Sequence, residues 1–231
     1  MRIRFVLVEP RVPENIGASA RALKTMGFCE LVLVNPCGWK EGKAKWVAHG
    51  SAEILENAAV FGSLAEAIGE SDLAIATSAK KRSVKEDFVS ADCLSSFLTA
   101  KGESIKVVSL VFGREESGLT NGEMKLCDLI STIRMAALYP SLNLSQAVMI
   151  YAYELAGLHS PGPAEMKGTG EGSFRAMRSK VTEVLLRAGI NENDNRYGRI
   201  LERVSFMGED DVHLVHSICN MILEKQGDGN H

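Results

Sequence analysis

Two kinds of hydrophobic pattern alternate along the first two thirds of the chain. Short runs of branched apolar residues predict buried strands, and longer segments with apolar residues every three or four positions predict helices. The predicted strands are Ile3 to Glu9, Leu31 to Asn35, Asp72 to Thr77, Lys106 to Phe112 and Leu129 to Ile133. The predicted helices are 13–28, 51–57, 63–69, 92–100, 121–127 and 144–155. This alternation is typical of an α/β domain with a mostly parallel sheet flanked by helices.

The composition changes at His159, where the run HSPGPAEMKGTGEGS is rich in Gly, Pro and Ser and is typical of a linker. Three further segments carry apolar residues at helical spacing: Phe174 to Ala188, Asn195 to Phe206 and Asp210 to Glu224. We therefore predict a domain over residues 1–158, a linker over 159–172 and a small α-helical C-terminal appendage over 173–231.

The segment Tyr139 to Leu155, YPSLNLSQAVMIYAYEL, places a polar turn before a nearly apolar helix. Asn143 is the predicted N-cap, since its side-chain oxygen can accept hydrogen bonds from the free amides of the first turn. The helix that begins at Leu144 is predicted to be buried. A polar turn leading into a buried helix can face a ligand pocket. The same pattern also fits an ordinary capped core helix.

Composition sets limits on the partners and the compartment. The chain has 231 residues, 45% of them hydrophobic, and a net charge of -3, so RNA binding would have to depend on local basic patches. The five cysteines are scattered without metal-ligand spacing and are predicted to be free, buried thiols in a reducing compartment. The pattern shows no signal peptide and no membrane span, so we expect a cytoplasmic protein.

Small polar residues follow three of the predicted strands. They lie in Thr77-Ser78-Ala79, in Gly113 to Gly118 and in Ile133 to Asn143. Each loop alone fits an ordinary turn, but ligands of parallel sheets bind beyond the carboxyl ends of the strands, and three such loops at one edge favour a binding site.

Nucleotide-binding fingerprints are absent from the sequence. The first strand is followed by PRVPENIG instead of a glycine-rich G-x-G-x-x-G turn, and no phosphate-binding G-x-x-x-x-G-K-[ST] occurs. Dehydrogenases and the commonest methyltransferase architecture are therefore disfavoured, although a nucleotide-dependent oxidoreductase remained an alternative.

Several charged residues have both a functional and a plain interpretation. Arg21 and the small residue Gly17 share a helix stripe, so its guanidinium could reach a phosphate or a ribose, or could simply be solvated. Glu115 could fix a neighbouring loop or be an exposed turn residue. Lys80, Lys81, Arg82 and Lys85 form a basic loop, and residues 172–203 carry seven basic against four acidic residues, a local charge of +3. These patches fit either RNA binding or solvated surfaces. The histidines show no triad or metal pattern.

Three segments together resemble one family. They are ENIGASARALKTMGF (14–28), LVFGREESGLTNGE (110–123) and SLNLSQAVMIYAYEL (141–155). In order and spacing they resemble the SPOUT superfamily of RNA methyltransferases, specifically the TrmH-like 2'-O-ribose methyltransferases of the TrmJ type. The helical tail also looks like the TrmJ tail in length and character.

The resemblance implies a sheet whose C-terminal part forms a trefoil knot, with S-adenosylmethionine bound in the knot, no metal, and an active site completed across a homodimer. By position the cofactor would contact Thr77, Ser78, Ala79, Gly113, Ile133, Ser141, Leu142 and Asn143. The residues that match the family's catalytic positions are Asn15, Arg21, Glu115, Ser141 and Asn143. Composition and topology rules alone predict an unknotted sheet, because knots are rare.

The implied reaction is attack of a ribose 2'-oxygen on the sulphonium methyl group. The implied substrate is tRNA rather than DNA, at nucleotide 32 of the anticodon loop, and related enzymes act on other tRNA or rRNA positions. The predicted RNA-binding residues are Lys80, Lys81, Arg82, Arg175 and Arg178. Lys80 stands where related sequences carry arginine, which removes a bidentate donor. A catalytically silent RNA-binding dimer is the other alternative.

Overall fold

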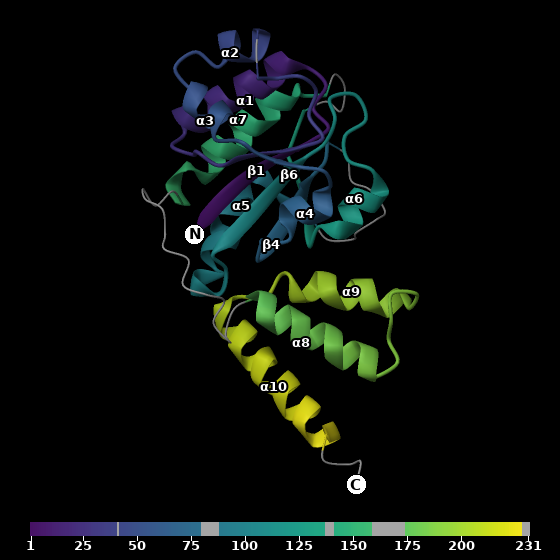
Figure 1. The fold of residues 1–231 in the computed structure, drawn as a ribbon. Helices are drawn as coiled ribbons and strands as arrows, with labels where there is room; N and C mark the ends of the chain where they lie inside the picture. The colour runs from purple at the N-terminus through teal and green to yellow at the C-terminus, as the bar shows by residue number, and fades with distance from the viewer. Residues whose placement is uncertain (41, 80–87, 137–140, 159–173, 228–231) are drawn as a thin grey trace.

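A seven-stranded parallel sheet organises the described residues, which in this computed structural model are 1–231 except 41, 80–87, 137–140, 159–173 and 228–231 (Figure 1). The strand order is β3-β2-β1-β6-β4-β7-β5. The strands are β1 (Arg2–Val8), β2 (Leu31–Val34), β3 (Ala59–Phe61), β4 (Leu73–Thr77), β5 (Phe88–Ser90), β6 (Val107–Phe112) and β7 (Leu129–Thr132). The predicted parallel α/β sheet is confirmed.

Helices cover both faces of the sheet, as the two hydrophobic clusters show. One cluster includes residues of α1 (Pro13–Thr25), α2 (Lys43–Val47), α3 (Ala52–Glu56), α5 (Ala91–Thr99) and α7 (Leu144–Leu155). The other includes α4 (Leu64–Ile68) and α6 (Asn121–Leu126). In β1, Phe5 and Leu7 face the first cluster, and Val6 and Val8 face the second. The continuous apolar run of β1 is therefore explained by burial on both faces.

Prediction from the pattern missed several short elements, among them β3, β5 and α2. Each has three to five residues, too few to repeat a helical or strand period. β3 and β5 lie at the two ends of the strand order, and β3 has no buried residue. Edge strands of this kind lack the apolar run by which the central strands were recognised.

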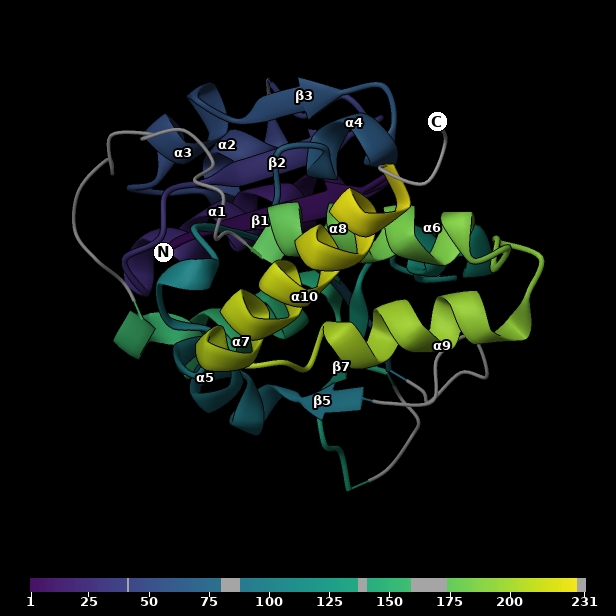
Figure 2. The ribbon, with the colours of Figure 1, turned by 90° about the horizontal axis from the view of Figure 1, so that it is seen from below.

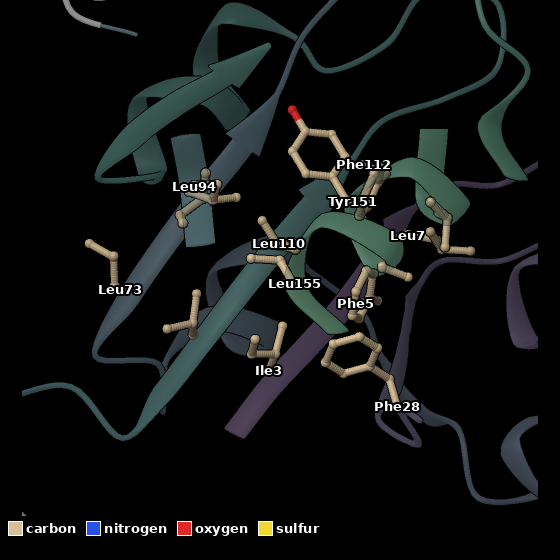
Figure 3. Packing of buried hydrophobic residues seen from close by; sticks show 14 of the residues in the cluster. Ile3, Phe5, Leu7, Phe28, Leu73, Leu94, Leu110, Phe112, Tyr151 and Leu155 are labelled. Atoms are coloured by element: carbon tan, nitrogen blue, oxygen red, sulfur yellow. The ribbon is translucent and has the colours of Figure 1, made fainter. Parts of the chain in front are cut away.

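Aromatic side chains fill the core between the sheet and the α1/α7 layer (Figure 3). The ring of Phe5 lies 5.2 Å from that of Phe28 and 6.1 Å from that of Phe112, and Phe112 meets Tyr151 edge to face at 5.5 Å. Tyr151 donates its hydroxyl proton to Ser131 Oγ at 3.0 Å. Burial raises the pKa of Tyr151, so its hydroxyl stays protonated. This helix-to-sheet packing fixes the place where α7 begins.

The prediction for α7 is confirmed at its start and wrong for its outer face. Asn143 Oδ1 accepts from the Ser145 amide at 2.9 Å, and Gln146 Oε1 accepts from the Asn143 amide at 3.0 Å, which completes a capping box. The helix was expected to be buried, yet Tyr153 is 68% exposed. The reason is that α7 lies in an outer layer, so only one of its faces meets the sheet.

The C-terminal helices cover the amino ends of the strands. They are α8 (Phe174–Arg187), α9 (Asn195–Val204) and α10 (Glu209–Gly227), all three predicted from the sequence. Seen from below, they run across the sheet edge where β1 starts (Figure 2). Phe174 and Met177 are fully buried in the same cluster as the α1/α7 layer. The appendage is therefore packed on the sheet domain, and the predicted boundaries at 158 and 172 stay predictions.

A buried lysine anchors this appendage. Lys101 is 1% exposed, its Nζ donates to the carbonyl oxygens of Ser205 and Met207 beyond α9, and it lies 4.8 Å from the centre of the Phe174 ring. Burial lowers the pKa of Lys101 to about 8, against the attraction of Asp128, which raises it. This role of Lys101 was not predicted from the sequence.

Two further predictions concern membrane-spanning helices and the state of the cysteines. No helix in the described ranges is long and apolar enough to cross a membrane. The cysteines are free, but the prediction that they are buried is wrong for Cys29 and Cys93, which are exposed. Cys29 lies in the turn after α1, and Cys93 lies on the outward face of α5.

Replacing Lys101 with methionine should change the pH dependence of stability. The folded pKa of about 8 lies below the ordinary 10.5, so between these values the unfolded chain binds more protons and stability from Lys101 rises with pH. Lys101→Met removes this effect together with two hydrogen bonds, at a cost of about 1–3 kcal/mol. In urea unfolding, the advantage of the wild type should grow between about pH 8 and pH 10. A pH-independent difference would contradict the assignment.

Candidate functional site

One pocket of about 380 Å³ lies where β4, β6 and β7 end and α7 begins. Three loops and the helix start form its wall. Seven of the eight predicted cofactor residues line it: Thr77, Ser78, Ala79, Gly113, Ile133, Ser141 and Leu142. Asn143, the eighth, lies next to the wall as the N-cap of α7. The structure thus brings together residues from loops up to 66 positions apart, from 77 to 143.

The pocket combines apolar walls with a polar rim. Its apolar lining comes from Phe112, Leu119, Met124, Leu144 and Tyr151. Thr77 Oγ1 donates to the Val111 carbonyl at 3.0 Å, so this hydroxyl joins the ends of β4 and β6. An apolar body with few polar groups is the usual make-up of a small-molecule site.

The loop after β6 folds tightly back on itself. The Gly118 amide donates to the Arg114 carbonyl at 2.9 Å, and Gly118 has a φ of 67°. A Cβ at Gly113 would lie 2.1 Å from the Gly118 carbonyl carbon, closer than any side chain allows. Glycine at 113 is therefore required for this pocket wall to exist.

A carboxylate joins this loop to α1. Glu115 Oε2 accepts from the Arg11 amide at 3.1 Å, and Oε1 accepts from the Val12 amide at 3.1 Å and from Asn15 Nδ2 at 3.0 Å. Asn15 Oδ1 in turn accepts from Asn143 Nδ2 at 2.9 Å. Glu115, Asn15 and Asn143, three of the predicted catalytic residues, thus form one chain of hydrogen bonds. The expectation that Glu115 fixes a neighbouring loop is confirmed.

These contacts decide the protonation state of Glu115. Partial burial alone would raise the pKa of this carboxyl, but the hydrogen bonds from Asn15 and from the Arg11 and Val12 amides outweigh it, and the pKa is lowered. Both carboxylate oxygens of Glu115 already accept hydrogen bonds from these donors. Glu115 is therefore a fixed anion that positions the loop, and a poor proton acceptor.

An ion-pair network, which reasoning from the sequence missed, supports the same loop. Arg114 donates to both carboxylate oxygens of Glu123, at 3.0 and 2.9 Å, and to Glu9 Oε2 at 3.0 Å. The hydrogen bonds to Glu123 and then Glu9 raise the pKa of Arg114, and Arg114 lowers that of Glu9. The sequence signal for this network is Glu9, a charged residue that directly follows a buried strand.

Arg21 does not line the pocket. It is exposed on α1, and its guanidinium has no partner within the described ranges. The stripe that Arg21 shares with Gly17 is not open at Gly17: a Cβ there would lie 2.1 Å from the Ala44 carbonyl oxygen, because α2 packs on the helix at this point. Gly17 therefore serves helix packing, while Arg21 is left free at the surface.

The predicted RNA-binding residues fall in two separate segments of the chain. Lys80, Lys81 and Arg82 lie outside the described residues. Arg175 and Arg178 lie on α8, which covers the amino ends of the strands, whereas the pocket lies at their carboxyl ends. Both arginines line a groove of about 360 Å³. Arg178 is ion-paired with the buried Asp128, so it also fastens α8 to the sheet. Most basic residues of the appendage likewise pair with carboxylates: Lys180, Arg187, Arg196 and Arg199.

Comparisons with known proteins match both parts of the chain. The profile of the SpoU rRNA Methylase family matches residues 2–153, and that of the tRNA/rRNA methyltransferase LasT C-terminal domain matches residues 171–226. LasT of Escherichia coli K12, named as an uncharacterized tRNA/rRNA methyltransferase, is 38% identical, over 96% of this chain and 97% of that protein.

Two TrmJ proteins are also similar. The tRNA (cytidine/uridine/adenosine-2'-O-)-methyltransferase TrmJ of Pseudomonas aeruginosa is 40% identical over 67% of this chain, and the match spans 60% of that protein. The crystal structure of TrmJ from Zymomonas mobilis ZM4 superposes with a TM-score of 0.62 at 26% identity, over 96% of this chain and 99% of that one.

Glu115→Gln should weaken the support of the pocket wall. A glutamine turns one acceptor into an NH2 group facing amide donors, at a cost of about 1–3 kcal/mol. Because the folded pKa of Glu115 is lowered, its stabilisation is present above the ordinary 4.5 and is lost as the pH falls through the folded value.

Urea unfolding at two pH values, pH 7 and a pH below the ordinary carboxyl pKa of 4.5, checks this result. The variant Glu116→Gln, at the exposed neighbouring position, is the control. The loss in Glu115→Gln should shrink in acid. An equal loss in both variants at pH 7 would remove Glu115 from its supporting role.

Proposed function

The chain belongs to the SpoU methylase family, and from this we propose that it methylates a ribose 2'-hydroxyl of tRNA with S-adenosylmethionine as the methyl donor. The observation that carries the proposal is the convergence of Thr77, Gly113 and Leu142 on one pocket. Gly113 and Leu142 come from two of the three segments by which the sequence resembles TrmH-like enzymes, and Thr77 ends the neighbouring strand β4. TrmJ relatives from Pseudomonas aeruginosa and Klebsiella pneumoniae, whose names state 2'-O-methylation of tRNA, support the substrate class.

The pocket fits the proposed cofactor in size and chemistry. A volume of about 380 Å³ is within the usual range for small-molecule sites. The apolar walls suit an adenine ring, and the backbone amides and carbonyls of the three loops suit its polar edges. When bound, the cofactor supplies a positively charged sulphonium whose methyl group is already activated.

The residues of the chain then have to align the two reactants. Asn15, Glu115 and Asn143 hold the loop and the helix start beside the pocket through their hydrogen-bond chain. Ser141 lies on the pocket wall, where its hydroxyl can contact the ribose. Arg21 orients the hydroxyl and the neighbouring phosphate. Since arginine hardly deprotonates and Glu115 is a poor acceptor, the proton leaves to solvent or to a phosphate oxygen.

A homodimer is part of the proposal. Arg21 is exposed and lies outside the pocket lining of a single chain, and the outer face of α7 carries the exposed Tyr153. Both observations fit the active site completed by a second copy that the family resemblance implies. The trefoil knot in the C-terminal part of the sheet also remains a proposal, and residues 137–140 before α7 lie outside the described residues.

The proposed target is nucleotide 32 of the anticodon loop, in the cytoplasm. TrmJ-type resemblance supports this position, whereas the LasT relative is named for tRNA or rRNA. Lys80, Lys81 and Arg82, which follow Ala79 in the sequence, are part of the proposal as RNA contacts. Arg175 and Arg178 would have to contact a distant part of the tRNA.

Incubation with radiolabelled S-adenosylmethionine and unmodified tRNA tests the function. Label should appear on a 2'-oxygen, which nuclease digestion and nucleoside mapping would locate. Label on a base would overturn the proposal. Tight tRNA binding without cofactor affinity in calorimetry would instead favour a catalytically silent RNA-binding dimer, the second candidate suggested by the basic residues of the appendage.

Arg21→Ala should abolish methyl transfer, by at least about 100-fold, while cofactor affinity measured by calorimetry stays nearly unchanged, because Arg21 lies outside the pocket lining. Lys24→Ala, an exposed cation one turn along α1, is the matched control and should retain activity. An active Arg21→Ala enzyme would remove Arg21 from the mechanism.

Asn143→Ala should weaken cofactor binding about 10-fold, since it removes both the α7 cap and the link to Asn15, each worth about 1 kcal/mol. Asn143→Ser separates the two, because serine can cap the helix but is too short to reach Asn15. Calorimetry should place the serine variant between the wild type and Asn143→Ala. Unchanged affinity in both variants would argue against the pocket assignment.

A further inference from the structure

The most exposed large apolar side chain in the described ranges is an indole close to the candidate site. Trp46 on α2 is 77% exposed, whereas the other tryptophan, Trp39, is only 7% exposed. An indole left in water loses the free energy that its burial would provide, about 2 kcal/mol or more. A single exposed apolar residue is common on protein surfaces, so the case for a partner at Trp46 depends on what surrounds it.

The exposure of Trp46 is imposed by the way α2 is held. Ala44 and Ala48, on the inner side of the segment, are buried at 0% and 1% exposed. The backbone of Ala44 lies against Gly17 so closely that no Cβ fits between them. Because its inner face is already packed on α1, α2 presents Trp46 outward on a fixed support.

Two basic residues share the short helix α2 with Trp46. Lys43 and Lys45, on α2, are 69% and 51% exposed. Lys43 Nζ lies 2.9 Å from Glu14 Oε1, and Lys45 Nζ lies 3.8 Å from Glu56 Oε1. Exposed ion pairs of this kind contribute little, so phosphates can compete for both lysines. Residues 40–49 carry three lysines and one glutamate, although the whole chain is acidic.

The same surface adjoins the catalytic positions. Glu14, the partner of Lys43, precedes Asn15 of the hydrogen-bond chain, and Arg21 lies on the same helix. Figure 1 shows α2 beside α1 at the end of the sheet away from the C-terminal helices. A nucleic acid whose ribose reaches the pocket would therefore pass near α2.

We propose that Trp46 stacks on an unpaired base of the RNA substrate, with Lys43 and Lys45 contacting the flanking phosphates. This inference rests on the proposed function and deepens it, because it selects single-stranded loop RNA over a regular duplex. Bases in an RNA duplex are stacked on each other, whereas loop bases can turn outward onto an aromatic side chain. Stacking on an aromatic ring does not require a particular base, so Trp46 adds affinity more than sequence choice.

Binding of unmodified tRNA to three variants tests the inference. Trp46→Ala should raise the Kd by about 5- to 100-fold, the range expected for one lost base stack. Trp46→Phe should lose less, because it keeps an aromatic face. Val60→Ala, which truncates another exposed apolar side chain on the edge strand β3, should leave the Kd unchanged. Cofactor affinity should be the same in all variants.

Tryptophan fluorescence gives a second readout, since the chain has only two tryptophans. Addition of tRNA to the wild type should quench emission, and most of this change should be missing in Trp46→Phe. An unchanged tRNA affinity in Trp46→Ala, or equal quenching in the wild type and Trp46→Phe, would overturn the inference. Conversion of a dimer to a monomer by Trp46→Ala would also overturn it, by assigning the surface to a second copy.

These experiments distinguish a failure of the proposed function from a failure of the stacking role of Trp46. If the wild type neither binds tRNA nor methylates it, the function itself is wrong. If the wild type methylates tRNA and Trp46→Ala does so with the same Kd and rate, only the stacking role is lost.

Discussion

The candidate site depends on one interaction, in which the Glu115 carboxylate accepts hydrogen bonds from three N–H groups. The loop after β6, the loop before α1 and the start of α7 come from separate parts of the chain and have no covalent reason to stay together. Glu115 joins the first two, and Asn15 extends the link to Asn143 at the third. Charge-assisted hydrogen bonds are strong enough to order these loops before any ligand binds.

All strands of a parallel sheet begin at one end of the sheet and finish at the other, and these two ends have different roles in this protein. At the carboxyl edge the loops diverge and leave a pocket, so polar contacts and ligand chemistry can gather there. At the amino edge the three C-terminal helices cover the strand starts, and their contacts are of the kind that stabilise a fold: Phe174 in the core, Arg178 on Asp128 and Lys101 on backbone carbonyls. The proposed chemistry is therefore separated from the packing of the appendage.

Much of this architecture followed from the sequence, because the central strands are buried on both faces and the longer helices repeat an apolar stripe. The short α2 could not be predicted from periodicity, and its packing on Gly17 depends on a contact between distant segments. The catalytic assignment of Asn15 came from resemblance alone, since a single asparagine at a helix start has many uses. Lys101 remained hidden because burial of a lysine depends on partners more than 100 positions away, Ser205 and Met207.

The central claim is that three separated loops form one site for a sulphonium methyl donor. A crystal structure with S-adenosylhomocysteine, the demethylated product of that donor, tests it most directly. The account predicts ligand density bounded by Thr77, Gly113 and Leu142, with its sulphur facing the Asn15 and Asn143 side of the pocket. Ligand density at another place on the chain, or no binding at saturating ligand, would contradict it.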